Sequence, residues 1–231
     1  MDRSKRLFRL RREGQAFAAC LSDDTLGNAV PSCPAWTLRD LTMHLGRVYG
    51  WAGAATRATE RPPRPELEWP ADAAGMADHL LAQLALLVDA LEGDPAQPAW
   101  SFAPGHGTLG FWQRRQLQET AVHRWDAEAA CGRTTDIDAE IAADGLDELA
   151  DILIGLRIAE GRLAPGASVT AVSGEGGRWT FGQGEPVAEV AGTASDLLLL
   201  GWRRLDADAP VLRWSGDVTA GQELVRGGLT P

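Results

Sequence analysis

The pattern of hydrophobic and polar residues up to about residue 161 is that of amphipathic helices. Apolar residues recur every three or four positions, the spacing that places them on one face of a helix. The helices predicted in this way cover residues 3–21, 37–57, 71–92, 109–131 and 137–160. Segments rich in proline or glycine, over 61–70 and 93–107, interrupt the pattern and are predicted as loops. Four or five antiparallel helices with such connections predict a helical bundle.

After Gly161 the spacing changes to the alternation that is typical of strands. A glycine-rich turn over 174–177 lies between two short alternating runs and predicts a hairpin. The elements predicted in this part are strands over 168–172, 178–181, 186–190 and 211–214 and a short apolar helix over 194–204. We therefore predict a mostly α protein with a small α+β part. Its two domains are a helical bundle over 1–161 and a small α+β domain over 162–231.

The second helix has a defined start. Thr37 is the N-cap, and Asp40 three residues later completes a capping box. Trp36 and Leu41 flank this start at the positions of a hydrophobic staple. The helix that follows carries His44, so its start fixes where that side chain points.

Composition and charge exclude some classes of partner. The chain has 231 residues, enough to bury a core without disulfides or a structural metal. No run approaches the roughly 18 apolar residues of a membrane span, and no signal peptide is apparent. The net charge of −10 has the wrong sign for nucleic-acid binding, and the basic residues near the N-terminus are interpreted as a solvated helix face. We expect a cytoplasmic protein that binds neither nucleic acid nor membrane.

The cysteines and basic residues indicate the cellular context. Cys20, Cys33 and Cys131 are odd in number and lack CxxC spacing, which argues against a disulfide framework or a thiolate zinc site and fits a reducing cytosol. Cys33 has no base near it in sequence and is interpreted as structural. Only one of the 22 basic residues, Lys5, is lysine, which together with abundant alanine and glycine indicates a GC-rich genome.

A carboxylate and an imidazole share one face of the fourth predicted helix. Glu119 and His123 lie four positions apart, so their side chains are about one helical turn from each other and can bind one metal ion. A solvated Glu–His pair is the alternative. Asp126 follows on the same helix, where it can orient a ligand histidine from the second shell or form an exposed pair with Arg124 or His123.

His44 supplies the third candidate ligand. It lies two turns into the second helix among Leu41, Leu45 and Val48, which mark the core-facing side. Helical bundles commonly build metal sites from facing helices, and two histidines with one glutamate leave coordination positions open, as in catalytic zinc sites. Zn²⁺ suits this set, while Ni²⁺, Co²⁺ and Fe²⁺ remain alternatives. The other interpretation of His44 is a hydrogen-bonded core histidine. His79 and His106 are assigned no role.

Four segments resemble one known family. The stretches VPSCPAWTLRDLTMHLGRVYGWA (30–52) and QETAVHRWDAEAACG (118–132) are similar to the mycothiol-dependent maleylpyruvate isomerase family. The later stretch VAGTASDLLLLGWRR (190–204), with the WSGD of 214–217, resembles the C-terminal α+β domain of that family. The resemblance implies a DinB-like antiparallel four-helix bundle followed by a small α+β domain.

The resemblance also implies a site. The metal ligands of the family fall on His44, Glu119 and His123, the set already reached from spacing. A basic residue thought to contact substrate or thiol in the family aligns best with Arg204, for which an ordinary surface arginine is the alternative. Tyr49 stands where the family often has a second histidine, and we interpret it as lining the pocket. Of the tryptophans near the motifs, most are interpreted as core and one or two as pocket lining; they are Trp36, Trp51, Trp112 and Trp125.

The implied chemistry is that of an activated thiol. A divalent metal, Zn²⁺ in our interpretation, deprotonates a bound thiol, and the thiol of the family is mycothiol, a cosubstrate of actinobacteria. The partners are thus a low-molecular-weight thiol and a small-molecule electrophile, and the reaction is either cis–trans isomerisation or S-transfer. Two alternatives stay open: hydrolysis by a zinc-bound water, and a non-catalytic protein that binds metal or ligand. We expect a monomer or a weak homodimer.

Overall fold

The structure is a computed structural model that describes residues 1–230. The chain forms two compact units, Met1–Thr135 and a second that begins at Asp136. The sequence predicts the division after residue 161, whereas the structure places it between Thr135 and Asp136. The reason is that the helical segment after residue 136 packs on α7 and β4 of the second unit.

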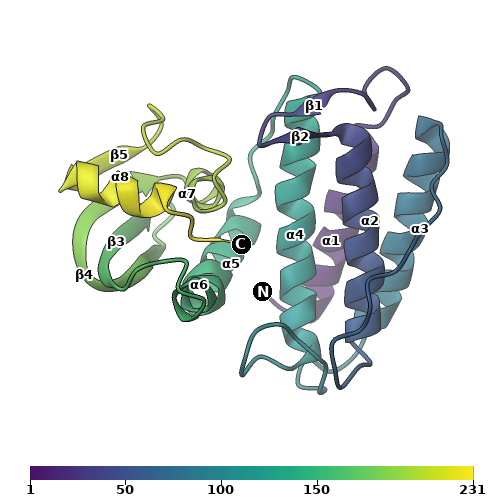
Figure 1. Ribbon diagram of the computed structural model, residues 1–231, viewed down its shortest axis with the longest axis horizontal. Helices are drawn as coiled ribbons and strands as arrows, with labels where there is room; N and C mark the ends of the chain where they lie inside the picture. Colours follow the sequence, from purple (N-terminus) through teal and green to yellow (C-terminus); the bar gives the residue numbers. More distant parts are fainter. Residues whose placement is uncertain (231) are drawn as a thin grey trace. The chain divides into compact units, whose positions relative to one another are not determined.

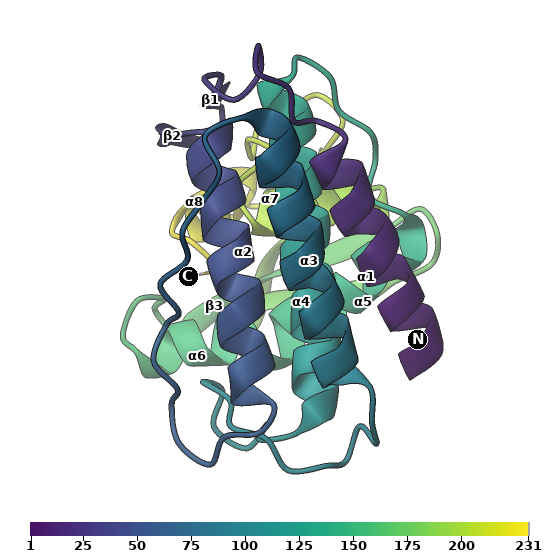
Figure 2. The ribbon, with the colours of Figure 1, turned by 90° about the vertical axis from the view of Figure 1, so that its right-hand side faces the viewer.

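The first unit is a four-helix bundle, as the sequence predicts. Its neighbouring helices do not all run antiparallel, because Glu13 contacts Arg124 and Cys20 contacts Cys131, so the first and fourth helices run in the same direction. A short hairpin of two strands connects the first helix to the second. The elements are α1 (Arg3–Ala18), β1 (Ala29–Val30), β2 (Cys33–Thr37), α2 (Leu38–Ala55), α3 (Ala73–Leu91) and α4 (Leu109–Ala130). The helices lie side by side (Figure 1), and α3 packs on both α1 and α2, between which it lies in the view of Figure 2. The predicted loops over 61–70 and 93–107 contain no helix and no strand longer than a single bridge.

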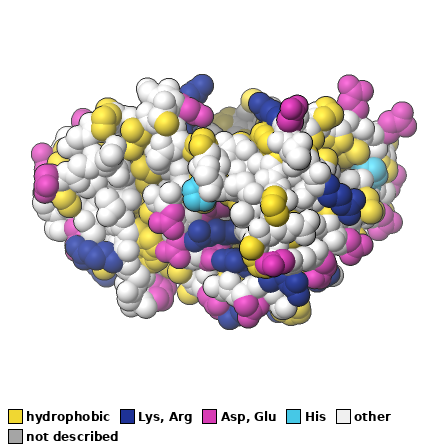
Figure 3. Space-filling model, turned by 90° about the horizontal axis from the view of Figure 1, so that it is seen from below, with side chains coloured by type: hydrophobic (Ala, Val, Ile, Leu, Met, Phe, Trp, Pro, Cys, Tyr) yellow, Lys and Arg dark blue, Asp and Glu magenta, His cyan; other side chains and the backbone are white. Residues whose placement is uncertain are grey.

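Apolar side chains from all four helices form the core of the bundle. Its fully buried members include Leu7, Leu10, Phe17, Leu41, Leu45, Met76, Leu80, Leu87 and Trp112. Helix α3 is long and apolar enough, by length and composition alone, to cross a membrane. Its apolar face instead packs on α1 and α2 within the bundle. On the face seen in Figure 3, acidic and basic side chains are interspersed.

Most buried polar side chains of this unit lie on α4, and one of them, Arg124, bonds to three separate segments. Its guanidinium donates to Glu13 of α1 and to Glu128 at 2.9 Å each, and to the carbonyl and hydroxyl oxygens of Thr135 at 2.9 and 2.7 Å. The sequence leaves open an exposed pair between Arg124 and Asp126, and that alternative is wrong because both residues are buried. Arg124 therefore joins α1, α4 and the chain that leaves α4.

The second unit is a small α+β fold. Its elements are α5 (Ala139–Glu148), a π-helical turn η1 (Leu149–Leu153), α6 (Ile154–Ala159), β3 (Gly166–Ser173), β4 (Arg178–Gly192), α7 (Ala194–Gly201), β5 (Arg213–Gly216) and α8 (Val218–Arg226). The sheet order is β3–β4–β5. Three features differ from the prediction: the helix over 137–160 contains the π turn, the strands over 178–181 and 186–190 are one, and α8 has no predicted counterpart.

Strand β4 pairs with both edges of β3. Val169 of β3 is in register with Phe181 from the first half of β4 and with Ala188 from its second half. Between these halves, Gly182 and Gly184 have φ values of +105° and +130°. A Cβ atom at either position would lie 2.6 Å or less from the backbone of β3. Glycine is therefore required where the strand bends.

We predict that Arg124→Ala destabilises the protein by about 3 kcal/mol, because the substitution leaves the buried carboxylate of Glu128 and the partly buried carboxylate of Glu13 without this cation. The measurement is the free energy of unfolding from urea titration. Arg11→Ala is the matched control, since Arg11 pairs with Glu92 where both side chains are about half exposed, and it should change stability by less than about 1 kcal/mol. Equal effects of the two substitutions would contradict the account.

Candidate metal centre

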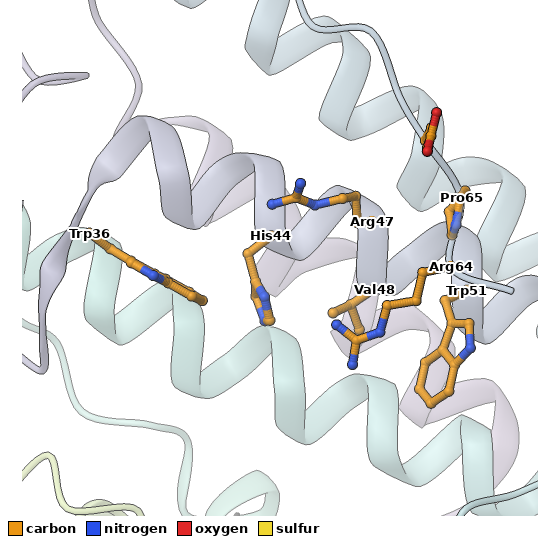
Figure 4. A pocket seen from close by; sticks show the side chains of 8 residues that line it. Trp36, His44, Arg47, Val48, Trp51, Arg64 and Pro65 are labelled. Carbon is orange, nitrogen blue, oxygen red and sulfur yellow. The ribbon is translucent and has the colours of Figure 1, made fainter.

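Two facing helices carry the three predicted ligands. His44 lies on α2, and Glu119 and His123 lie on α4. The start of α2 is the predicted capping box, in which Asp40 accepts from the Thr37 backbone N–H at 2.9 Å and the Thr37 side chain accepts from the Asp40 backbone N–H. The ring of Trp36, just before this cap, lies 4.8 Å from that of His44. This local structure directs the imidazole of His44 toward α4 (Figure 4).

The ligand atoms of these residues converge. His44 Nε2 lies 3.3 Å and His123 Nε2 3.2 Å from the same carboxylate oxygen, Glu119 Oε1. One ligand atom from each residue lies within 4.8 Å of the others. Two imidazole nitrogens and a carboxylate oxygen are a common ligand set for Zn²⁺ and leave coordination positions open. The residues present thus fit a divalent metal ion in both donor type and spacing.

Three further side chains hold the ligands in place. Asp126 Oδ2 lies 2.9 Å from His123 Nδ1, which leaves Nε2 of that ring facing Glu119. Ser32 donates to the other oxygen of Asp126 at 2.6 Å. Arg115 donates to Glu119 Oε2 at 3.2 Å, so the second oxygen of that carboxylate is also bound. Carboxylates that orient a ligand histidine in this way are usual around protein metal ions.

Burial and charge shift the pKa values of the central pair in opposite directions. Burial raises the pKa of Glu119, but the charge and hydrogen bond of His123, with His44 and Arg115, outweigh it and hold that pKa well below its usual range. Burial lowers the pKa of His123, and the carboxylates of Glu119 and Asp126 outweigh it, raising that pKa to about 9. Without a metal ion, His123 is therefore an imidazolium between two carboxylates. A metal ion bound by His123 would take the place of that proton.

A cavity of about 440 Å³ opens beside His44. Its lining consists of Trp36, His44, Arg47, Val48, Trp51, Arg64, Pro65 and Glu66. Figure 4 shows the two indoles at its ends and the guanidinium groups of Arg47 and Arg64 on either side of Val48. The loop that follows α2 supplies Arg64, Pro65 and Glu66, and it is fastened to α2 where Trp51 Nε1 donates to the Pro62 carbonyl oxygen at 3.0 Å. The lining of the cavity therefore combines a candidate metal ligand with two indole rings and two guanidinium groups.

Comparison with known proteins assigns the family. The family model described as "Mycothiol maleylpyruvate isomerase N-terminal domain" matches residues 7–128, more than half of the chain. The chain belongs to this family. The resemblance inferred from the sequence motifs is thus confirmed.

Individual relatives of this maleylpyruvate isomerase family member are distant. Two uncharacterised proteins, MT0763 and Rv0738, from two strains of Mycobacterium tuberculosis, are each 30% identical over 145 residues, which are 58% of this chain and 72% of theirs. A solved mycothiol-dependent maleylpyruvate isomerase has a TM-score of 0.63 at 15% identity, and a histidine-to-alanine variant has 0.61 at 14%. Each covers 93% of both chains, and this likeness confirms the predicted fold class of helical bundle plus small α+β part.

The structure corrects one expectation for this family member. Tyr49 was expected to line the pocket but is fully buried. Its hydroxyl lies 3.0 Å from Thr120 Oγ1, and burial raises its pKa. The ring faces the core between α2 and α4, so the residue packs the helices that carry the ligands.

The other predicted residues are found as follows. Trp36 and Trp51 line the cavity, whereas Trp112 is fully buried in the core. Arg204 lies in the second unit, after α7, and donates to the Trp202 carbonyl oxygen at 2.8 Å. The ring of His79 packs at a tilt against that of Trp69, with ring centroids 4.6 Å apart.

Sequence reasoning missed Ser32 and Arg115. The position of Arg115 four residues before Glu119 is a usable signal, because the two side chains share a helix face. Nothing near Ser32 in the sequence points to Asp126, 94 residues away.

We predict that the metal-free protein loses stability as pH rises from 7 to 10. A pKa of His123 raised from 6.5 to about 9 means that its contribution is fully present below pH 6.5 and is lost as pH rises through 9. The loss attributable to His123 is about 2 kcal/mol. It is measured as the difference in unfolding free energy between wild type and His123→Gln at each pH. A difference that stays constant between pH 7 and 10 would show that His123 is not held as an imidazolium.

We further predict that His123→Ala weakens zinc binding at least about 100-fold while the bundle stays folded. The dissociation constant is measured by competition with a chromogenic chelator, and the fold by far-ultraviolet circular dichroism. His79→Ala, which removes a histidine that packs against Trp69, is the control and should bind zinc like wild type. Unchanged zinc affinity in His123→Ala would refute the ligand assignment.

Proposed function

We propose that this protein is a metal-dependent enzyme that uses a low-molecular-weight thiol, mycothiol in this family, to attack a small electrophile. The observation that carries the proposal is the convergence of His44, Glu119 and His123 on one point beside the cavity. The family, and a solved relative that is a mycothiol-dependent maleylpyruvate isomerase, support the choice of thiol and reaction class. We expect the enzyme to act in the cytoplasm, where thiols are reduced.

Each residue around the site has its own role in the proposed mechanism. A divalent ion held by His44, Glu119 and His123, Zn²⁺ in our proposal, would stabilise the thiolate form of a bound thiol near neutral pH. Asp126 holds the proton on Nδ1 of His123, which leaves Nε2 free to act as a ligand. Arg115 keeps Glu119 ionised and in place through its second oxygen.

The cavity has features suited to the electrophile. The guanidinium groups of Arg47 and Arg64 are exposed donors that can bind an anionic group. The indoles of Trp36 and Trp51 offer flat apolar surfaces for a conjugated carbon skeleton. A conjugated anionic substrate bound in this way would have its activated double bond next to the thiolate.

Two reactions share the first step. The thiolate sulfur adds to one carbon of a cis double bond, and the electron pair of that bond moves to the electron-withdrawing group. Rotation about the resulting single bond and elimination of the thiolate yield the trans isomer and regenerate the thiol. In a transferase the adduct is protonated on carbon and released with its new carbon–sulfur bond. On the family resemblance alone, we also propose Arg204 as a residue that contacts substrate or thiol.

We predict that zinc-loaded protein isomerises maleylpyruvate, or conjugates it, only when mycothiol is present. His44→Ala and Glu119→Gln should lower kcat/KM by a factor on the order of 100 or more, because each removes a metal ligand. His106→Ala, in the loop before α4, is the matched control and should keep wild-type activity. Product is followed by chromatography with and without the thiol.

The other outcomes separate the alternatives. Turnover of ester or amide substrates without thiol would replace the proposal by metal-assisted hydrolysis. Bound zinc without turnover of any electrophile, with any thiol, would make the protein a metal or ligand binder.

A further inference from the structure

Two cysteines outside the metal centre lie against one another at neighbouring helix ends. Cys20 follows the last turn of α1, and Cys131 caps α4. The thiol of Cys131 donates to the backbone carbonyl oxygen of Cys20 at 3.5 Å. Since α1 and α4 pack along their length, this proximity belongs to the helix packing of the bundle. Both thiols are free in the structure.

The two thiols differ in exposure and surroundings. Cys20 is 4% exposed, whereas Cys131 is partly exposed and reachable from solvent. The Cys20 thiol donates to the Ala16 carbonyl oxygen at 3.5 Å, and Arg133 donates to its sulfur at 3.7 Å. Burial raises the pKa of Cys20, while the hydrogen bond from Arg133 opposes that rise. Cys131 is thus the thiol that an outside reagent meets first, and Cys20 has a cation beside its sulfur.

We infer that Cys20 and Cys131 form a reversible disulfide when the protein meets a low-molecular-weight disulfide. The Cys131 thiolate attacks one sulfur of that reagent, forming a mixed disulfide and releasing one thiolate. The Cys20 thiolate then attacks the sulfur of Cys131, which releases the second thiol. Two protein thiols are oxidised, one external disulfide is reduced to two thiols, and the two protons pass from the cysteines to the products.

The geometry requires only a local change. Disulfide formation needs Cα atoms about 4.4–6.8 Å apart, and Cys131 Sγ already touches the main chain of Cys20. To reach Cys131, the Cys20 sulfur must leave its contacts with the Ala16 carbonyl oxygen and with Arg133. Neither contact is a backbone hydrogen bond of a helix.

The disulfide would join two segments that carry or orient the candidate metal ligands. The segment that begins at Cys20 continues to Ser32, which binds Asp126, and to Trp36, which packs on His44. Helix α4, which ends at Cys131, carries Glu119 and His123. Oxidation would thus link the segment from Cys20 to Trp36 covalently to the end of α4.

The test uses the full reduced chain, freed of reductant and incubated with oxidised glutathione before alkylation under denaturing conditions. The chain has three cysteines, so the expected product has a mass lower by two hydrogen atoms and a single alkylated thiol, on Cys33. Trypsin leaves Cys20 and Cys33 in one peptide, because no lysine or arginine lies between Arg12 and Arg39. Cleavage before Asp23 separates them and shows which one is bonded to Cys131.

Two variants sharpen the result. Cys33→Ser is the matched control and should form the same disulfide to the same extent. Cys20→Ser should stop at a stable glutathione adduct of Cys131, since the resolving thiol is missing. Three alkylated thiols in wild type, a glutathione adduct that persists on Cys131, or a bond to Cys33 would each overturn the inference.

Discussion

The candidate site depends on the placement of one partly buried carboxylate, that of Glu119. Glu119 is largely removed from water, and an ionised carboxylate in such a place needs partners that replace its hydration. His44 and His123 approach one of its oxygens, and Arg115 binds the other. Two of these partners lie on the same helix, but His44 comes from α2. The spacing between α2 and α4 is therefore set by the same contacts that assemble the ligands.

The rest of the first unit maintains that spacing. The capping box at Thr37 fixes the first turn of α2, and Tyr49, hydrogen-bonded to Thr120, packs between the two helices further along. Arg124 ties α4 to α1 on another side through Glu13. The chain between α1 and α2 adds Ser32 behind Asp126 and Trp36 beside His44. Ligand geometry is thus the product of helix packing, with hydrogen bonds that orient individual rings.

The features that could be predicted from the sequence are local ones. Periodicity located the four bundle helices, and the spacing of Glu119 and His123 placed two ligand candidates on one helix face. His44 could be predicted as the third ligand because it lies on the core-facing side of its helix, and the family resemblance pointed to the same residue. The turn after β3 could also be predicted, because clusters of glycine residues favour turns.

The features that could not be predicted depend on which surfaces meet. The apolar face of the helical segment after residue 136 shows that it is buried, but not that it packs on α7 and β4. The pairing of Ser32 with Asp126 crosses 94 residues and follows from no periodic pattern. Tyr49 was expected in the pocket because it stands where the family often has a second histidine, yet its position on α2 puts the ring in the core. Long β4 was divided in two because glycines at its bend resemble a loop.

The most direct test of the central claim is X-ray absorption at the zinc edge of reconstituted wild-type protein. The account predicts one bound ion with imidazole nitrogen and carboxylate oxygen neighbours at about 2.0–2.2 Å and no sulfur from the protein. A sulfur shell near 2.3 Å in the absence of added thiol would assign the metal to cysteines. That result, or a spectrum without imidazole scattering, would contradict a centre built on His44, Glu119 and His123.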